Sequence, residues 1–303
     1  MSNVFKRMIE LNGMPYHLSH PGETFWVDEN AGNGVNNRRG TFANPDSTIE
    51  SCMSRCTSGR GDVIMVKPGH IENISAAADL VCDVIGVTII GLGSGDDQAK
   101  IVFDTADTAD IDVSVSNVTF DHMWFECNFA DVDGAIDVAA TGTYFTIQNC
   151  RFTNTSTILN FEEVINLAAA ANYFSFLNND VHLIEGSTAE SLVFTQGECL
   201  AMRVIGNNIV GEFSTSIFDV DATALTGGPI FRNNFMINLT AAADYCVEID
   251  ATTVAIFCNE RYGTGGADEP LNDAAASFLI DCHGVDTAIT SSILWPTTTV
   301  TWP

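Results

Sequence analysis

Two stretches in the C-terminal half of the chain carry the residue types best suited to acid–base chemistry. Around residues 218–221 and 247–250, acids stand two positions apart, at Asp219, Asp221, Glu248 and Asp250. Residues two apart share a face of a strand, so neighbouring strands would bring these four carboxylates together. Such a group could form a glycosidase pair or bind calcium. We favour the simpler interpretation that they are water-facing positions, which Asp137 also occupies in an earlier segment.

Other candidate sites are weaker. The six histidines show neither triad nor metal-ligand spacing. Cys52 and Cys56 could supply half of a metal site, but no matching Cys or His pair follows at zinc-finger spacing. Nine cysteines, an odd number, favour reduced, buried thiols. We therefore predict no metal and no cofactor.

An internal repeat organises the positions of these residues. Six short segments share a strand followed by a small turn, and their fourth residues fall at intervals of 23, 29, 28, 27 and 26 residues: Cys127, Cys150, Asn179, Asn207, Asn234 and Glu260. A period in this range indicates one unit copied along an axis. We predict that Cys127, Cys150, Asn179, Asn207 and Asn234 form an inward structural ladder, in which the amides satisfy backbone groups at the turn. Ordinary turn residues are the alternative.

The residues within each unit indicate strands. Apolar and polar residues alternate, as in Phe145-Thr-Ile147 and Phe174-Ser-Phe176, and a second apolar run follows in each unit. We predict an all-β fold, a single-stranded right-handed parallel β-helix of about 7–9 coils. Residues 46–282 would form the β-helix, residues 1–45 an N-terminal anchor and cap segment, and residues 283–303 a C-terminal tail.

The segment before the coils predicts a capping helix. In Asn44-Pro-Asp-Ser-Thr-Ile49, Asp46 or Ser47 can cap a helix that has Ile49, Met53 and Cys56 on one face. Gly61-Asp-Val-Ile-Met-Val66 follows as a strand and ends in a Pro-Gly turn. A short helix of this kind would cover the open end of a solenoid.

Residues 25–282 resemble the pectate-lyase-like β-helix superfamily. The order of a turn, a Thr-Ile helix, a Gly-Asp strand, Pro-Gly and then Val87-Thr-Ile-Ile-Gly91 is similar to the cap and first coil of those proteins. The resemblance implies the fold and leaves the activity open, since the superfamily spans lyases, hydrolases, phage tailspikes and proteins without catalysis. The motif set of a polygalacturonase-like hydrolase does not occur in order. A pectate-lyase-like site would need carboxylates that face an Arg or Lys, and residues 101–303 hold four arginines and no lysine. We therefore expect no enzymatic activity.

The charge distribution limits the partners. The net charge is −27; residues 1–100 hold 12 acids and 8 bases, and the remaining residues hold 27 acids and four bases. Such an acidic coil surface would repel phosphate backbones, which excludes nucleic acid. No apolar run reaches the length of a membrane span. The less acidic N-terminal part, with Arg38 and Arg39, is the expected docking end.

Acidic, reduced β-helices without a catalytic signature resemble virion proteins of tailed bacteriophages. The resulting expectation is a non-catalytic homotrimeric decoration protein on the capsid surface, assembled in the host cytoplasm and docked to the major capsid protein or another virion protein. A tailspike-type depolymerase of host surface glycan, acting through the four acids above, is one alternative. A carbohydrate-binding adhesin that uses Trp124, Trp295 and Trp302 is another.

Overall fold

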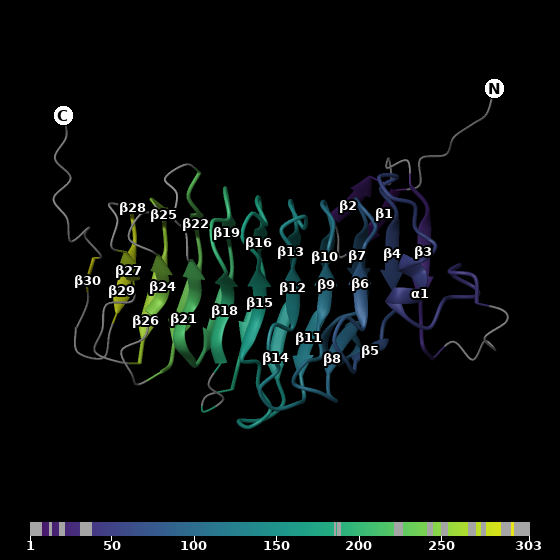
Figure 1. The fold of residues 1–303 in the computed structure, drawn as a ribbon, viewed down its shortest axis with the longest axis horizontal. Coiled ribbons are helices and arrows are strands. Elements are labelled where there is room, and N and C mark those ends of the chain that lie inside the picture. The colour runs from purple at the N-terminus through teal and green to yellow at the C-terminus, as the bar shows by residue number, and fades with distance from the viewer. Residues whose placement is uncertain are drawn as a thin grey trace.

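Short segments with one apolar face become strands here because each coil can bury that face on the inside of a stack. The computed structural model describes residues 8–11, 14–17, 22–30, 38–184, 186, 189–220, 227–240, 245–249, 254–265, 271–273, 277–285 and 292–293. Successive coils pack side by side along one long axis (Figure 1), and each contributes one strand to each of three parallel sheets. This is the predicted right-handed parallel β-helix.

The strands of the three sheets follow one another in a fixed order along the chain. The first sheet contains β3 (Thr24–Val27), β4 (Val63–Val66), β7 (Thr88–Gly91), β10 (Thr119–Asp121), β13 (Thr146–Gln148), β16 (Ser175–Leu177), β19 (Arg203–Ile205), β22 (Ile230–Arg232), β25 (Ile256–Cys258) and β28 (Phe278–Ile280). The second contains β5 (Ile71–Ile74), β8 (Lys100–Phe103), β11 (Trp124–Cys127), β14 (Arg151–Asn154), β17 (Asp180–His182), β20 (Asn208–Gly211), β23 (Phe235–Asn238), β26 (Arg261–Thr264), β29 (His283–Val285) and β30 (Ser292–Ile293), the last antiparallel to β29. The third contains β6 (Leu80–Cys82), β9 (Ile111–Val113), β12 (Ile136–Val138), β15 (Glu163–Leu167), β18 (Ala189–Thr195), β21 (Phe213–Val220), β24 (Tyr245–Ile249) and β27 (Leu271–Asp273).

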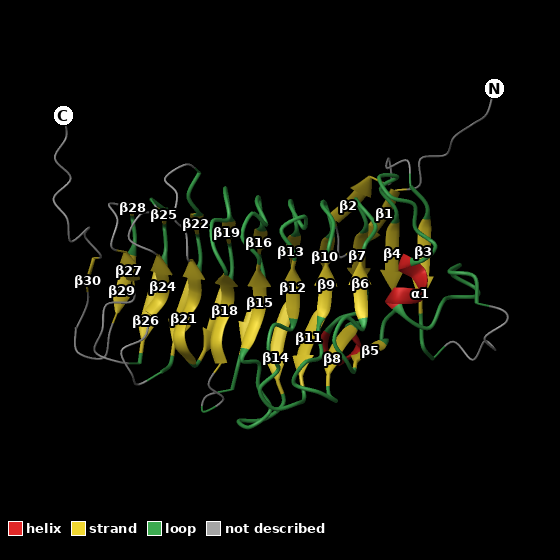
Figure 2. Ribbon diagram, in the orientation of Figure 1, coloured by secondary structure: helices red, strands yellow, loops and turns green. Residues whose placement is uncertain are grey.

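Helices are scarce in the described part of the chain (Figure 2). They are α1 (Ile49–Met53) and one 3₁₀ turn (Gly95–Asp97), while β1 (Met8–Leu11) and β2 (Met14–His17) form a separate antiparallel pair. None of the helices described has the length and apolar character needed to cross a bilayer.

Aromatic rings fill the inside of the coils. Phe125 and Phe152, from neighbouring coils, stack with centroids 4.7 Å apart, and Phe231 stacks on Phe257 at 5.0 Å. All four side chains are fully buried. Because every inward position meets its equivalent one coil away, burial of like side chains fixes the register of the coils.

A buried column of polar side chains follows the turn between the first and second sheets. The Asn179 backbone N–H and Nδ2 donate to Asn207 Oδ1 at 2.8 and 3.2 Å, and the same two groups of Asn207 donate to Asn234 Oδ1, both at 2.9 Å. The N–H of Cys150 donates to Asn179, and Asn234 donates to Glu260. These bonds satisfy backbone groups that the turn removes from the sheet.

The turn itself explains the Asn-Asn pairs. Asn178 and Asn233, which precede two of the ladder residues, have φ of 53° and 58°. Asn tolerates this left-handed region better than most residues. In these two pairs the first Asn therefore makes the sharp bend and the second points inward, whereas before Asn207 the bend is made by Gly206, with φ of 74°.

Cys127 is not part of this column, contrary to the prediction. It ends β11 and pairs with Phe103 and Asn154, whereas the residue that precedes β11, as Cys150 precedes β14, is Met123. The alignment of the repeats placed Cys127 in the column because Trp124–Phe129 resembles the turn segments of the other coils in composition. In the structure most of this segment is the strand β11. With Met123 in the column, the irregular interval of 23 residues disappears.

Replacing Asn207 with Leu should lower the free energy of unfolding by about 1–3 kcal/mol, because Asn179 loses its acceptor and the Phe176 carbonyl loses its donor. Chemical denaturation measures the change. Asn208→Ala, one residue away and exposed, should change stability by less than about 0.5 kcal/mol. Equal effects of the two substitutions would contradict the role of the ladder.

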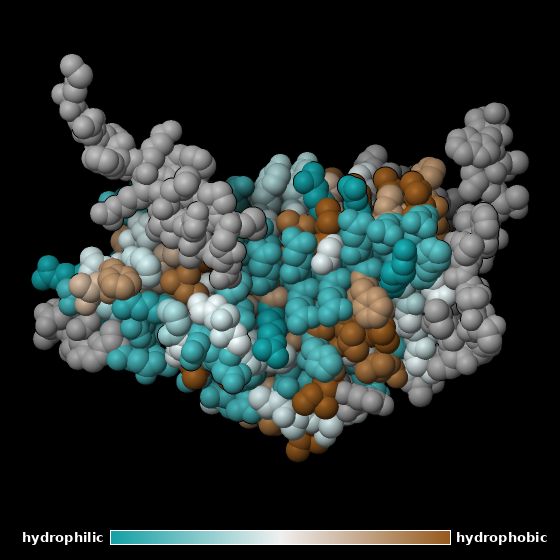
Figure 3. Space-filling view, turned by 180° about the vertical axis from the view of Figure 1, so that it is seen from behind, coloured by the Kyte–Doolittle hydropathy of each residue, from teal (hydrophilic) through white to brown (hydrophobic). Residues whose placement is uncertain are grey.

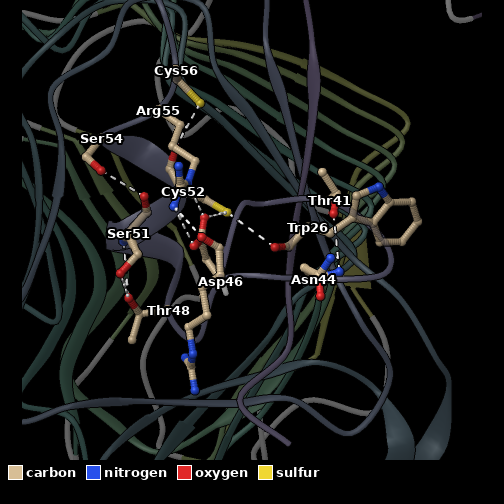
Figure 4. Close-up of polar contacts among 11 residues, drawn as sticks. Trp26, Thr41, Asn44, Asp46, Thr48, Ser51, Cys52, Ser54, Arg55 and Cys56 are labelled. Atoms are coloured by element: carbon tan, nitrogen blue, oxygen red, sulfur yellow. Dashed lines mark hydrogen bonds and ion pairs between the residues drawn. The ribbon is translucent and has the colours of Figure 1, made fainter. Parts of the chain in front are cut away.

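The N-terminal end of the coils is covered by α1. Its buried residues Ile49, Cys52 and Met53 face the core. The cap is Thr48, whose hydroxyl accepts from the Ser51 N–H at 3.1 Å, and not Asp46 or Ser47. Asp46 instead binds the Arg55 guanidinium, with Oδ2 2.5 Å from Nε, and accepts from Cys52 Sγ (Figure 4).

The parallel sheets extend beyond the expected limits of residues 46 and 282. β3 lies within residues 1–45 and pairs with β4, and β29 lies after residue 282 and pairs with β26. The N-terminal segment is thus partly built into the first coil, because β3 completes the edge of the first sheet.

Some apolar side chains remain on the outside of the coils. Register places Ile230, Ile256 and Phe278 in one outward row of the first sheet, and Phe278 is 54% exposed. Seen from behind, the molecule shows apolar patches that interrupt a largely polar surface (Figure 3). The homotrimer expected from the sequence would use such surfaces and stays a prediction.

Candidate functional site

The outer face of the third sheet carries a row of mostly polar side chains along the axis of the solenoid. Register aligns the central outward residue of each strand from β9 to β24: Asp112, Asp137, Asn166, Phe194, Asp219 and Glu248. Alternation along each strand makes these positions outward, since their neighbours are buried in the core. The row therefore combines acids from separate coils on one face.

The acids predicted from the sequence lie at the C-terminal end of this row. Asp219 and Glu248 are direct partners on β21 and β24, as their spacing predicted. Asp221 and Asp250 lie outside the described residues. Phe194 and Asn166 separate this pair from the acids nearer the N-terminus, so the row holds two distinct acidic groups.

The other group lies at the edge of a hollow. Asp110, Asp112 and Asp137 have carboxylate oxygens within 4.8 Å of one another, a spacing at which they could hold a metal ion. A cavity of about 280 Å³ borders this group. It lies over β9, β12 and β15 and the turns that follow, and its lining is Asp112, Val113, Ser114, Asp137, Val138, Ala139, Asn166, Ala168 and Gln196.

Asp137 is the central carboxyl of this group. Burial raises its pKa to about 6, and the charges of Asp110, Asp112 and Asp133 act in the same direction. Its side chain folds against Gly134, where a Cβ would come within 2.7 Å of Asp137 Oδ1 and where φ is +61°. Glycine at this position therefore makes room for the carboxyl and allows the bend before β12.

Glu163, at the start of β15, is the second perturbed carboxyl. Burial raises its pKa to about 7, followed by the charges of Asp133, Glu190, Glu162 and Asp137. The Asp137 charge thus contributes to the raised pKa of Glu163. A pair of neighbouring carboxyls with unequal, raised pKa values can hold one proton near neutral pH, which is the requirement for a general acid beside a general base.

The charges of the described strands on this face are all negative. None of the described strands of the third sheet contains a Lys or Arg. The four arginines after residue 100 lie on the first sheet (Arg203, Arg232) and the second (Arg151, Arg261). Trp124 is buried with Lys100 and Arg151 over its ring, so it offers no stacking surface. Trp295 and Trp302 lie outside the described residues.

The basic N-terminal residues take part in the cap. The Arg55 guanidinium donates to the Arg38 carbonyl at 3.2 Å, which fixes that backbone beside α1. Arg39 is exposed. Docking through Arg38 and Arg39 stays a prediction.

A buried acid and histidine lie next to the cap. Glu72 accepts from the Ile49 N–H with both carboxylate oxygens and lies 2.8 Å from His70 Nε2. His70 Nδ1 accepts from the Glu29 N–H, so Nε2 carries the proton. Both side chains are buried and tie three chain segments together, which is a structural role.

Six buried cysteines are poor nucleophiles. Burial raises the pKa of Cys127 and Cys246 to about 12 and that of Cys199 to about 11. The pKa values of the Cys52, Cys82 and Cys150 thiols are raised for the same reason. Thiols that stay protonated at neutral pH do not attack or ligate readily.

A pair of identical triplets in the sequence could have pointed to this site. Ile111-Asp-Val113 and Ile136-Asp-Val138 occur in adjacent coils, and they place Asp112 directly beside Asp137. The sequence-based interpretation treated Asp137 only as an outward position. Asp110 and Glu163 have no comparable signal, because Asp110 precedes β9 and Glu163 begins β15, and the sequence does not set the register of these strand ends.

Comparisons with known proteins support the fold. No family model matches the chain, and no curated protein matches it by sequence. Among solved structures, a rhamnogalacturonan lyase is similar, with a TM-score of 0.51 and 11% identity over 81% of this chain and 75% of that one. At this identity the likeness shows a shared parallel β-helix fold.

The comparison corrects one expectation. We expected that the chain is not an enzyme because known motif sets are missing, but the solved structure that it resembles is a lyase. Motifs of selected subtypes were too narrow a test, since a β-helix assembles its site from outward residues of several coils. The likeness to phage tailspikes is not shown by this neighbour.

Proposed function

We propose that the protein hydrolyses a neutral glycan on the outer face of the third sheet, with Asp137 and Glu163 as the acid–base pair. The observation that carries this proposal is the hollow over β9, β12 and β15, which borders Asp137 on a face with no Lys or Arg among its described strands. An open groove along a solenoid suits a long polymer, because successive coils can contact successive sugar rings.

The two carboxyls have different tasks in this mechanism. Protonated Glu163 gives its proton to the glycosidic oxygen as the C–O bond breaks. Ionised Asp137 takes a proton from the attacking water, whose oxygen bonds to the anomeric carbon. The reaction consumes one water and yields one new reducing end.

Charge distinguishes this reaction from elimination on a polyuronate. Elimination needs a base and a cation that neutralises the uronate; a metal ion at Asp110, Asp112 and Asp137 could supply the cation, but the described strands of this face contain no Lys or Arg to act as the base. A chain of net charge −27 also repels an anionic polymer. A neutral substrate avoids both costs.

The activity assay measures new reducing ends after incubation with xyloglucan, galactomannan and hydroxyethyl cellulose. Asp137→Asn should abolish the reaction, whereas Asp219→Asn, an outward acid of the same row, should leave it nearly unchanged. Loss in Asp219→Asn alone would move the site to the Asp219 and Glu248 pair. Unsaturated products, or no cleavage of any of the three polymers, would contradict hydrolysis of neutral glycans.

The biological setting proposed for this activity is inferred from the sequence. A tailspike-type depolymerase, carried as a homotrimer on a bacteriophage particle and directed at host surface glycan, would accommodate this activity. Attachment to a capsid protein and assembly in the host cytoplasm stay predictions.

A further inference from the structure

Two exposed tyrosines form a flat stack on the turns that leave the third sheet. The rings of Tyr144 and Tyr173 lie 4.3 Å apart at an angle of 5°, and the side chains are 49% and 41% exposed. They follow β12 and β15, whose turns begin at Ala139 and Ala168 in the lining of the hollow. The stack therefore belongs to the same two coils as Asp137 and Glu163.

The backbone at these positions does not favour tyrosine. Tyr144 and Tyr173 have φ of 59° and 65°, in the left-handed region where bulky residues are uncommon. The equivalent positions of the neighbouring coils hold Asn117 and Ala201, with φ of 61° and 56°. Backbone bonds from the Asn117, Tyr144 and Tyr173 N–H groups to the next turn place all four residues in one column. Smaller residues therefore adopt the same backbone conformation at these turns, and the fold does not require tyrosine there.

The stack stops where the column changes to small residues. After Tyr173 the next position is Ala201, and the Ala201 N–H bonds to the carbonyl of Gly227 in the following coil. Coils rise by about 4.8 Å, close to the thickness of one more ring. A ring placed over Ala201 would continue the stack on the far face of Tyr173.

We propose that Tyr173, supported by Tyr144, is a sugar-stacking subsite, on which one pyranose ring of the substrate lies over Ala201. This inference rests on the proposed function, whose glycan would extend from the hollow to this platform. A pyranose has an apolar C–H face, and a rigid aromatic surface binds such faces at low entropic cost. Tyr173 is a binding residue here and takes no part in proton transfer.

Binding can be measured without cleavage. The full-length protein with Glu163→Gln is run in native gels that contain xyloglucan, galactomannan or hydroxyethyl cellulose. Adding Tyr173→Asn should weaken the retardation about tenfold, and Tyr173→Phe should preserve it. Asn suits the left-handed backbone, as Asn117 shows, and thermal melting checks that the fold is kept. Phe278→Ala, which removes an exposed apolar side chain from the first sheet, should have no effect.

The outcomes separate the two proposals. Tyr173-dependent retardation without any cleavage by the wild-type protein would support the platform and reject the hydrolase. Cleavage with a KM that Tyr173→Asn leaves unchanged would reject the platform and keep the hydrolase. Retardation lost equally in Phe278→Ala would show general apolar adsorption, and absence of retardation by all three polymers would overturn the platform.

Discussion

Glu163→Gln should lower kcat on the cleaved glycan by at least about 100-fold, with little change in KM, because it removes a general acid and leaves the groove intact. Glu163 lies at the start of β15, half-buried, and the charges of Asp133, Glu190 and Glu162 act on it. Glutamine keeps its size and cannot donate the proton. Steady-state rates of reducing-end release measure the change, and a variant that retains full kcat would remove Glu163 from the mechanism.

The pH dependence tests the assignment of roles. Below pH about 6 Asp137 gains a proton and cannot act as the base, and above pH about 7 Glu163 loses the proton that it must donate. We expect kcat to be highest between these values. Glu190→Gln is the matched control, since the Glu190 charge raises the pKa of Glu163. Its removal should shift the alkaline limb to lower pH while most of kcat is kept.

The fold was predictable because its physics is local and repeated. The alternation of apolar and polar residues is set within one coil, and the spacing of Asn179, Asn207 and Asn234 shows that the same unit recurs in the next coils. The misplacement of Cys127 shows where local patterns fail. A strand and a turn of similar composition differ only in their pairing partners, which here are Phe103 and Asn154.

The site was less predictable because it depends on the distances between coils. Asp219 and Glu248 were found from spacing alone, and the structure makes them neighbours. What distinguishes Asp137 and Glu163 is desolvation together with the charges of residues from other turns. These effects follow from three-dimensional packing, and a single sequence shows only that the residues are acidic.

The ladder ends in a carboxyl that weakens the fold at neutral and alkaline pH. Glu260 is fully buried and accepts from the N–H and Nδ2 of Asn234. Burial raises its pKa from 4.5 to about 7. The folded state therefore holds this proton more tightly than the unfolded state, so the contribution of Glu260 to stability is most favourable below pH 4.5 and falls as the pH rises to about 7. The full penalty, present above pH 7, is about 3 kcal/mol.

Glu260→Asn should remove this penalty and extend the ladder by one amide. Asn207 and Asn234 each accept from the preceding Asn and donate Nδ2 to a carbonyl of the preceding coil, Phe176 or Val204. An Asn at 260 has the Phe231 carbonyl in the equivalent place. Denaturation at pH 8 should show a gain of up to about 3 kcal/mol, less about 1 kcal/mol for the methylene lost from the core. At pH 4 the gain should vanish and the small cavity cost remain. Asp107→Asn removes a charge from an exposed position and should show no such crossover. An equal effect of Glu260→Asn at both pH values would mean that ionisation of Glu260 is not the cause.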